Sequence, residues 1–200
     1  MAITLNGNGT LTGVSVGGLP DGIVDTDMLA ANAVTAAKAT GSAKGITMQD
    51  SWVITSSYTT NSVAVITANW ARHSASSTLF GNIGSAMTES SGVFTFPSTG
   101  IYLVKATLVI RAEGGGRSYL GCEQQISSDS GSNYTDSTVA YNSAYTGQYY
   151  AGPTSIGVFD ITNASTFRWR LRHVLSDTSQ IMANATSKHS GVTFTRLGDT

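Results

Sequence analysis

The sequence predicts an all-β protein, in which a sandwich or barrel of antiparallel strands follows an N-terminal arm. Ser and Thr supply 53 of the 200 residues and Gly another 22, a composition that favours strands and turns over long helices. From Trp52 onward, short runs of alternating apolar and polar residues recur at nearly regular spacing. The first 46 residues contain no Trp, Tyr or Phe, so they lack the large side chains of an independent core.

The arm is expected to span residues 1–46 and to contain one short helix near residues 26–39. The phrase "DTDMLAANAVTAAKA", residues 25–39, is rich in Ala and begins with residues that can cap a helix. A helix of about 12 residues is marginal by itself in water, so it needs a surface to dock on. Its larger apolar side chains, which are the candidate docking residues, are Met28, Leu29 and Val34.

Residues 47–200 are predicted to form a single domain of antiparallel strands. Its strand-like runs are separated by turns rich in Gly, Ser, Asn and Pro. These runs are residues 51–58, 61–70, 92–97, 100–112, 117–127, 154–162, 166–175 and 190–197. Residues 141–153 are predicted to form a long loop instead. So many short strands in about 150 residues are typical of a sandwich or barrel.

Composition also argues against several classes of protein. The formal net charge is -1, so no overall field attracts nucleic acid or an anionic membrane. The longest apolar runs have four or five residues, far short of the ~20 that cross a bilayer, and membrane insertion is not expected. The N-terminus lacks the basic and apolar regions of a secretory signal, and Cys122 is the only cysteine. Synthesis in a reducing cytoplasm is therefore expected.

The sequence does not predict an enzyme. Common catalytic motifs such as GxSxG, HExxH and the Walker loop are missing, and "NGNG" is too short for a dinucleotide fingerprint. The three histidines, His73, His173 and His189, lie in separate strand-like segments. Cys122 belongs to an alternating strand, where a buried structural thiol is expected. No acidic or histidine cluster has ligand spacing, so neither a metal nor a cofactor is expected.

The sharpest local pattern is "FRWRLRH", residues 167–173. Strand alternation sends its three apolar residues to one face and its three arginines to the other. The arginines are Arg168, Arg170 and Arg172. Three guanidinium groups on one strand face repel each other unless they are neutralised. Two explanations stay open: pairing with acids of neighbouring strands or of an adjacent subunit, and contact with an anionic glycan or phosphate.

Tyrosines are unusually dense in the predicted loop at residues 141–153. They are Tyr141, Tyr145, Tyr149 and Tyr150. Exposed Tyr side chains provide rigid amphipathic contact area of the kind used at interfaces and for stacking on sugars. Packing against a neighbouring subunit and contact with a receptor or glycan are the two alternatives for these residues.

Residues 89–110, "ESSGVFTFPSTGIYLVKATLVI", combine a Gly-x-Phe-x-x-Pro strand, a turn and a Gly-x-Tyr strand. This pair resembles consecutive strands of the complement globular-head and tumour necrosis factor-like jelly rolls. Further matches, among them "FDITNASTFRWRL" and "SKHSGVTFTRL", extend the resemblance over residues 50–197. The resemblance implies an antiparallel jelly-roll sandwich and assembly as a homotrimer.

A second resemblance concerns the arm, because "MLAANAVTAAKA" is similar to phrases in fibre and appendage proteins of tailed bacteriophages. Together the two resemblances imply a virion structural protein, a homotrimeric fibre or decoration knob, made in the host cytoplasm. The arm would bind other virion proteins of the capsid or tail, and the knob would project outward toward host-surface glycans. The alternative is a non-viral trimeric adhesin or lectin-like module, and fold alone does not separate the two.

Overall fold

The computed structural model describes residues 4–5, 11–12, 45–73, 82–114, 117–145, 149–185 and 187–200. The chain divides into two units, Met1–Ala43 and Lys44–Thr200. In the first unit the described residues form one antiparallel pair, β1 (Thr4–Leu5) with β2 (Leu11–Thr12). The helix expected near residues 26–39 lies outside the described residues, and it stays a prediction. The same is true of the docking residues Met28, Leu29 and Val34.

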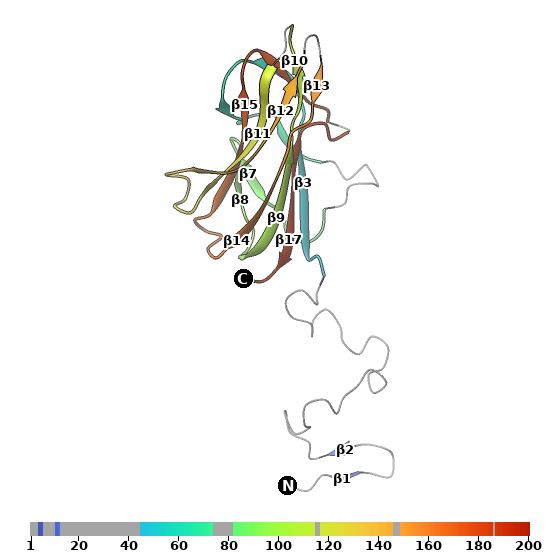
Figure 1. Ribbon diagram of the computed structural model, residues 1–200. Coiled ribbons are helices and arrows are strands. Elements are labelled where there is room, and N and C mark those ends of the chain that lie inside the picture. Colours follow the sequence, from blue (N-terminus) through green and yellow to red (C-terminus); the bar gives the residue numbers. More distant parts are fainter. Residues whose placement is uncertain are drawn as a thin grey trace. The chain divides into compact units, whose positions relative to one another are not determined.

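The second unit contains two main antiparallel sheets that face each other (Figure 1). The five-stranded sheet has the order β14 (Thr154–Ile161), β9 (Gly100–Thr107), β17 (Gly191–Gly198), β3 (Met48–Ile54) and β6 (Trp70–Arg72). The six-stranded sheet has the order β12 (Thr135–Ala144), β11 (Arg117–Ser127), β15 (Arg168–Leu175), β8 (Val93–Thr95) and β7 (Thr88–Ser90), and its sixth strand, β5 (Ala64–Val65), pairs with β15. A smaller sheet has the order β13 (Tyr150–Ala151), β10 (Val109–Ala112), β16 (Ser179–Met182) and β4 (Tyr58–Thr60).

The chain passes repeatedly between the two main sheets. Strands β3, β9, β14 and β17 belong to the five-stranded sheet, and β8, the β11–β12 hairpin and β15 lie between them along the chain in the other sheet. As a result β3 pairs with β17, although the two strands stand at opposite ends of this unit's sequence. Two facing antiparallel sheets with such crossings form a jelly roll. The all-β jelly-roll class predicted from the sequence is therefore confirmed.

An aromatic cluster fills the space between the main sheets. Phe94 of β8 lies at its centre and is fully buried. Its ring centroid is 5.3 Å from that of Trp52, 5.2 Å from Trp70, 5.4 Å from Trp169 and 5.2 Å from Phe194. The three tryptophans meet it edge to face, the arrangement that the quadrupoles of aromatic rings favour. One phenylalanine of the six-stranded sheet thus contacts three strands of the opposite sheet.

A buried amide also joins the two sheets. The Gln124 Nε2 atom of β11 donates to the Val104 carbonyl oxygen at 3.3 Å and to the Ser155 Oγ atom at 3.2 Å, both across the core. The Gln124 Oε1 atom accepts a hydrogen bond of 2.9 Å from Trp169 Nε1. Because donors and acceptor are satisfied, the amide is tolerated in the core and fixes the position of one sheet over the other.

A buried carboxylate fixes the edge of the five-stranded sheet. Asp50 of β3 is fully buried and accepts hydrogen bonds from Trp52 Nε1 at 3.0 Å, from Arg72 Nε at 2.9 Å and from the Met87 backbone at 2.8 Å. The Arg72 guanidinium also donates to the Met87 carbonyl oxygen at 2.9 Å. Charge pairing and hydrogen bonding offset the cost of burying the carboxylate. Asp50 thereby holds β6 and the segment before β7 against β3.

Part of the segment predicted as a loop is strand instead. The hairpin strand β12 continues through Ala144, and Tyr150–Ala151 forms β13, so residues 141–153 are not one long loop. The long strand β11 keeps β12 paired, with irregular register at two places along the ladder. A bulge of this kind lets an edge strand twist while it remains hydrogen-bonded to its neighbour. Of the described residues in this range, Tyr145, Tyr149, Gly152 and Pro153 lie outside the strands.

Removal of residues 1–46 should leave a folded knob, which we define as residues 47–200. Strand β3 begins at Met48, and the buried hydrophobic residues of the described ranges all lie at or beyond it. We expect the circular dichroism spectrum of the knob to show a β protein and its melting temperature to lie within a few degrees of the full chain. An insoluble or unfolded knob would show that the arm is part of the core.

Candidate functional site

Apolar side chains are exposed on the outward side of the five-stranded sheet. Its edge strand β14 alternates, so that Phe159 and Ile161 point into the core while Ile156 and Val158 point outward. The exposed fractions of the latter two side chains are 56% and 62%. Both faces of this strand are therefore apolar, although only one face is covered within the described chain.

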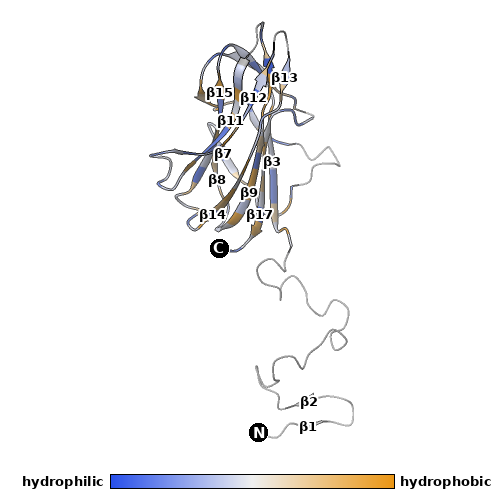
Figure 2. Cartoon of the chain, in the orientation of Figure 1, coloured by the Kyte–Doolittle hydropathy of each residue, from blue (hydrophilic) through white to orange (hydrophobic). Residues whose placement is uncertain are grey.

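Neighbouring strands extend this patch. The register of the sheet places Val158 beside Leu103 of β9, and Ile101 and Leu197 continue the patch on β9 and β17. Figure 2 shows hydrophobic segments along β14, β9 and β17 near the C-terminus. We call Ile101, Leu103, Ile156, Val158 and Leu197 the apolar sheet face. Full burial of one such side chain contributes about 1.5–3 kcal/mol, so this face is suited to contact with another protein surface.

The six-stranded sheet presents the predicted arginines on its outward side, and Arg172 is neutralised there. Its guanidinium forms ion pairs with Glu123 of β11 and, at 3.2 Å, with Asp136 of β12. Gln125 Nε2 donates to Asp136 as well, at 2.5 Å. This hydrogen bond is the main reason that the pKa of Asp136 is lowered, whereas burial raises the pKa of Glu123.

The other two arginines also have partners within the chain. Arg170 Nε donates to Gln125 Oε1 at 2.7 Å, and its guanidinium lies 3.5 Å from the centroid of the Tyr134 ring. Arg168 donates to the carbonyl oxygens of Phe167 at 2.8 Å and Ser165 at 2.9 Å. All three guanidinium groups are therefore held by neighbours in the same chain. Contact of these arginines with a glycan stays a prediction.

The structure brings Tyr141 together with a tyrosine that the sequence reasoning missed. Tyr141 of β12 and Tyr119 of β11 lie 5.9 Å apart between ring centroids, and with Val174 they line an open hollow of about 340 Å³. Gly121 lies beneath, where a Cβ atom would come within 2.6 Å of the Tyr141 ring. Strand alternation opposite the buried Cys122 was the signal that could have found Tyr119.

The other predicted tyrosines are exposed elsewhere. Tyr145, Tyr149 and Tyr150 are 84%, 55% and 61% exposed. Tyr150 belongs to β13 and pairs with Arg111 in the four-stranded sheet, whereas Tyr141 belongs to the six-stranded sheet. The structure therefore places Tyr141 and Tyr150 in two different sheets, while Tyr145 and Tyr149 lie outside the strands.

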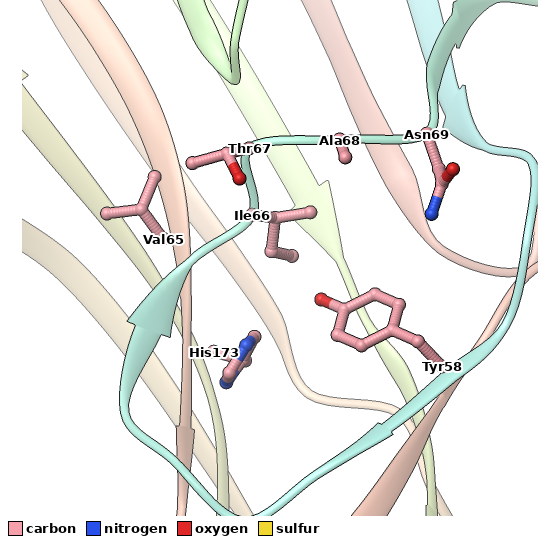
Figure 3. Close-up of a pocket in the computed structure, with 7 residues that line it drawn as sticks. All are labelled: Tyr58, Val65, Ile66, Thr67, Ala68, Asn69 and His173. Atoms are coloured by element: carbon pink, nitrogen blue, oxygen red, sulfur yellow. The ribbon is translucent and has the colours of Figure 1, made fainter.

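A small cavity of about 140 Å³ lies between β4 and the segment that follows β5 (Figure 3). Tyr58 and His173 line it, with ring centroids 6.0 Å apart, and His173 Nδ1 lies 3.0 Å from the Ser62 carbonyl oxygen. Burial raises the pKa of Tyr58 and lowers that of His173, so both side chains are neutral at pH 7. The cavity has less than half the volume of the smallest typical ligand pockets, about 300 Å³, and its lining contains no Lys, Arg, Asp or Glu that would attract a small ion. We interpret the pair as packing.

Cys122 is buried between the main sheets, as the sequence predicted. Its Sγ atom lies 3.5 Å from the Ala106 carbonyl oxygen, and burial raises its pKa to about 11. A thiol in this state is a poor nucleophile. Across the described ranges, no group of three or more His, Cys, Asp or Glu side chains is placed to hold a metal ion. The same ranges contain no helix with the length and hydropathy of a membrane span.

Solved structures share this arrangement of strands. The structure of Eiger TNF from S. frugiperda aligns with a TM-score of 0.57 over 76% of this chain and 94% of that chain, at 12% sequence identity. Murine APRIL, crystallised at pH 5.0, aligns with a TM-score of 0.52 over 74% of this chain and 98% of that chain, at 11% identity. No protein-family model matches the sequence, and a search of curated proteins finds no match. The fold is therefore a jelly roll of the tumour necrosis factor type.

Proposed function

We propose that the protein is a homotrimeric knob in which the apolar sheet face is the contact between subunits. The observation that carries this proposal is the exposure of Ile156 and Val158 on an edge strand whose other face is already in the core. A monomer leaves these side chains in water, whereas closed cyclic symmetry covers them in every copy. The resemblance to trimer-forming jelly rolls supports three copies.

We further propose that the trimer is a fibre or decoration knob of a tailed-bacteriophage virion, made in the host cytoplasm. The phrase "MLAANAVTAAKA" supports this assignment through its similarity to phage appendage proteins. The arm, which includes the unit Met1–Ala43, would bind capsid or tail proteins. The outward side of the six-stranded sheet would then face the host surface and its glycans.

The triple substitution Met28→Ser, Leu29→Ser and Val34→Ser tests the role of the arm. We expect the variant to fold and to trimerise but to be lost from particles, because three copies of the apolar contact are removed at once. The measurement is the amount of protein in purified particles relative to the wild type. Substituting serines at the neighbouring Ala30, Ala31 and Ala33 is the matched control, since these side chains bury little apolar area. Normal incorporation of the triple variant into particles would contradict the docking role and would indicate that the arm is only a spacer.

The alternative is a non-viral trimeric adhesin or lectin-like module. The hollow between Tyr119 and Tyr141 favours it, because aromatic rings on an open surface stack on the apolar faces of sugars. Binding of the knob to immobilised glycans without any association of the full chain with particles would favour this function over the virion assignment.

A further inference from the structure

A cavity of about 260 Å³ opens on the outward side of the five-stranded sheet and borders the apolar sheet face, since Lys105 in its lining lies beside Ile156. It is lined by Lys105, Thr107, Lys188, His189 and Thr193. The first two come from β9 and Thr193 from β17, whose register sets Thr193 directly beside Lys105. The remaining two belong to the segment that leads into β17. Three stretches of chain thus contribute to one recess.

The segment that carries Lys188 and His189 is fixed in place by Ser190. The Ser190 side chain is fully buried, donates to the Met182 carbonyl oxygen at 2.6 Å and accepts from the Val109 backbone at 2.9 Å. Its carbonyl oxygen accepts a hydrogen bond of 3.0 Å from the Ile54 backbone. These bonds tie the residue after His189 to three strands. The backbone that carries Lys188 and His189 is therefore held at the cavity before any ligand arrives.

The Lys188 ammonium is oriented toward the sheet. Its Nζ atom donates to Thr193 Oγ1 at 2.5 Å, and that hydroxyl oxygen is 2.9 Å from Ser51 Oγ. On the other side of Lys105, the Thr107 hydroxyl oxygen lies 2.9 Å from that of Thr154. The cavity therefore offers hydroxyl groups beside the lysines, and the Lys188 ammonium is already held by one of them.

The cavity gathers cationic groups without an acidic one. Its titratable lining residues are Lys105, Lys188 and His189, and no carboxylate belongs to the lining. Within the described ranges, no ion pair joins either lysine to Asp or Glu. Burial, and then the charge of Lys105, lower the pKa of Lys188 to about 8. The protonated form of Lys188 is therefore costly unless a counter-ion is present.

We propose that this cavity binds a tetrahedral oxyanion of the sulfate or phosphate class. The ammonium groups of Lys105 and Lys188 supply the charge, and His189 and the Thr107 hydroxyl supply further donors. A compact anion with oxygens in several directions suits donors that come from separate stretches of chain. The cavity is complete within one chain, so this inference goes beyond the proposed assembly and does not depend on it.

Sulfate is the probe for the test, because its charge stays constant from pH 6 to pH 10. Full-length protein is titrated with sulfate by calorimetry and melted with sulfate or chloride at equal ionic strength. We expect sulfate to raise the melting temperature by several degrees more than chloride, as binding to the native state requires. Lys188→Met and Lys105→Met should each weaken sulfate binding at least tenfold. The matched control, Lys38→Met, removes the same charge from the other unit and should bind like the wild type.

The pH dependence gives a second readout. Sulfate affinity should fall more than tenfold between pH 7 and pH 9.5, because Lys188 loses its proton in this range. Lys188→Arg keeps a positive charge throughout, so it should retain binding at pH 9.5. Lys105 and His189 are the same residues in the wild type and in Lys188→Arg, so a difference between the two proteins reports on position 188.

Three results would overturn the proposal. The first is an equal response to sulfate in the wild type, Lys188→Met and Lys105→Met, since the anion would then act elsewhere. The second is no response of the wild type to sulfate, accompanied by loss of oligomers in Lys188→Met, which light scattering measures in the same buffers. A wild type that gives no response while Lys188→Met keeps its oligomers would overturn the proposal as well. Loss of oligomers in Lys188→Met would mean that a carboxylate of another copy neutralises the lysines. A monomeric wild type that still binds sulfate would contradict only the proposed assembly.

Discussion

Replacement of Ile156 and Val158 together by Asp is expected to convert the proposed trimer into folded monomers. Both side chains are more than half exposed in the single chain, so two carboxylates there should not disturb the core. In an interface the same carboxylates would lose their hydration, which costs several kcal/mol for a carboxylate without a partner. The carboxylate at position 158 would lie beside Leu103, so it carries this cost, whereas the one at position 156 would lie beside Lys105. Light scattering should report about three times 20.8 kDa for the wild type and one chain mass for the variant.

The control for this experiment is Val63→Asp. Val63 is 49% exposed and directly precedes β5, which pairs with the six-stranded sheet rather than with the sheet that bears the apolar face. This variant should remain trimeric with the melting temperature of the wild type. A wild type that is monomeric at micromolar concentration, or a double variant that stays trimeric, would contradict the proposed interface.

Phe94→Ala should cause the largest loss of stability from a single substitution in the knob. Large-to-small changes at buried Phe cost about 3–5 kcal/mol, because transfer free energy is lost and a cavity remains. Phe94 is fully buried and contacts all three tryptophans, so the loss should lie at the upper end of that range. Since the free energy of unfolding of a typical domain is about 5–15 kcal/mol, this substitution would remove a large part of the stability of the knob.

Urea unfolding followed by Trp fluorescence measures this effect directly, since each indole ring lies against the substituted side chain. The native emission should shift to longer wavelength as water approaches the rings. Val139→Ala is the control, because Val139 is 45% exposed and its truncation should change stability by less than about 0.5 kcal/mol. A loss below 1 kcal/mol for Phe94→Ala would show that the aromatic cluster relaxes around the gap.

Strands with clean alternation were predictable from the sequence, whereas the hairpin strand β12 was not. Strands β9 and β15 bury every second residue over most of their length, and each falls inside a predicted run. Strand β17 alternates in its first half and extends one residue beyond its predicted run. In β12, "TDSTVAYNSA", nearly every side chain is exposed or partly exposed, and polar residues occupy both faces. Its strand conformation comes from pairing with β11, a tertiary contact that local composition does not encode.

For the candidate surfaces, too, one part was predictable from the sequence and another part required the structure. Alternation predicted that Arg168, Arg170 and Arg172 share a face. The partners of Arg170 and Arg172 stand far away along the chain, so their pairing needed the structure. The apolar sheet face carried a signal in "TSIGVFDIT" that was available in the sequence. Apolar residues occupy both odd and even positions of that strand, so both of its faces are apolar, as in strands that are covered on two sides. In a two-layer sandwich the core covers only one face of each strand. The other apolar face of β14 must therefore be covered by a surface outside the core.

The pairing of β3 with β17 has a consequence for how the knob forms during synthesis. Met48 lies opposite Arg196, so the five-stranded sheet is closed by residues nearly 150 positions apart. Contacts of such long range slow folding, because a large loop must close before they are made. Until Gly191–Gly198 leaves the ribosome, β3 and β9 both have an unpaired edge, and such edges can add strands from other chains. Correct assembly of neighbouring nascent chains therefore requires β17, and slow translation just before β17 would lengthen the period in which misassembly can occur.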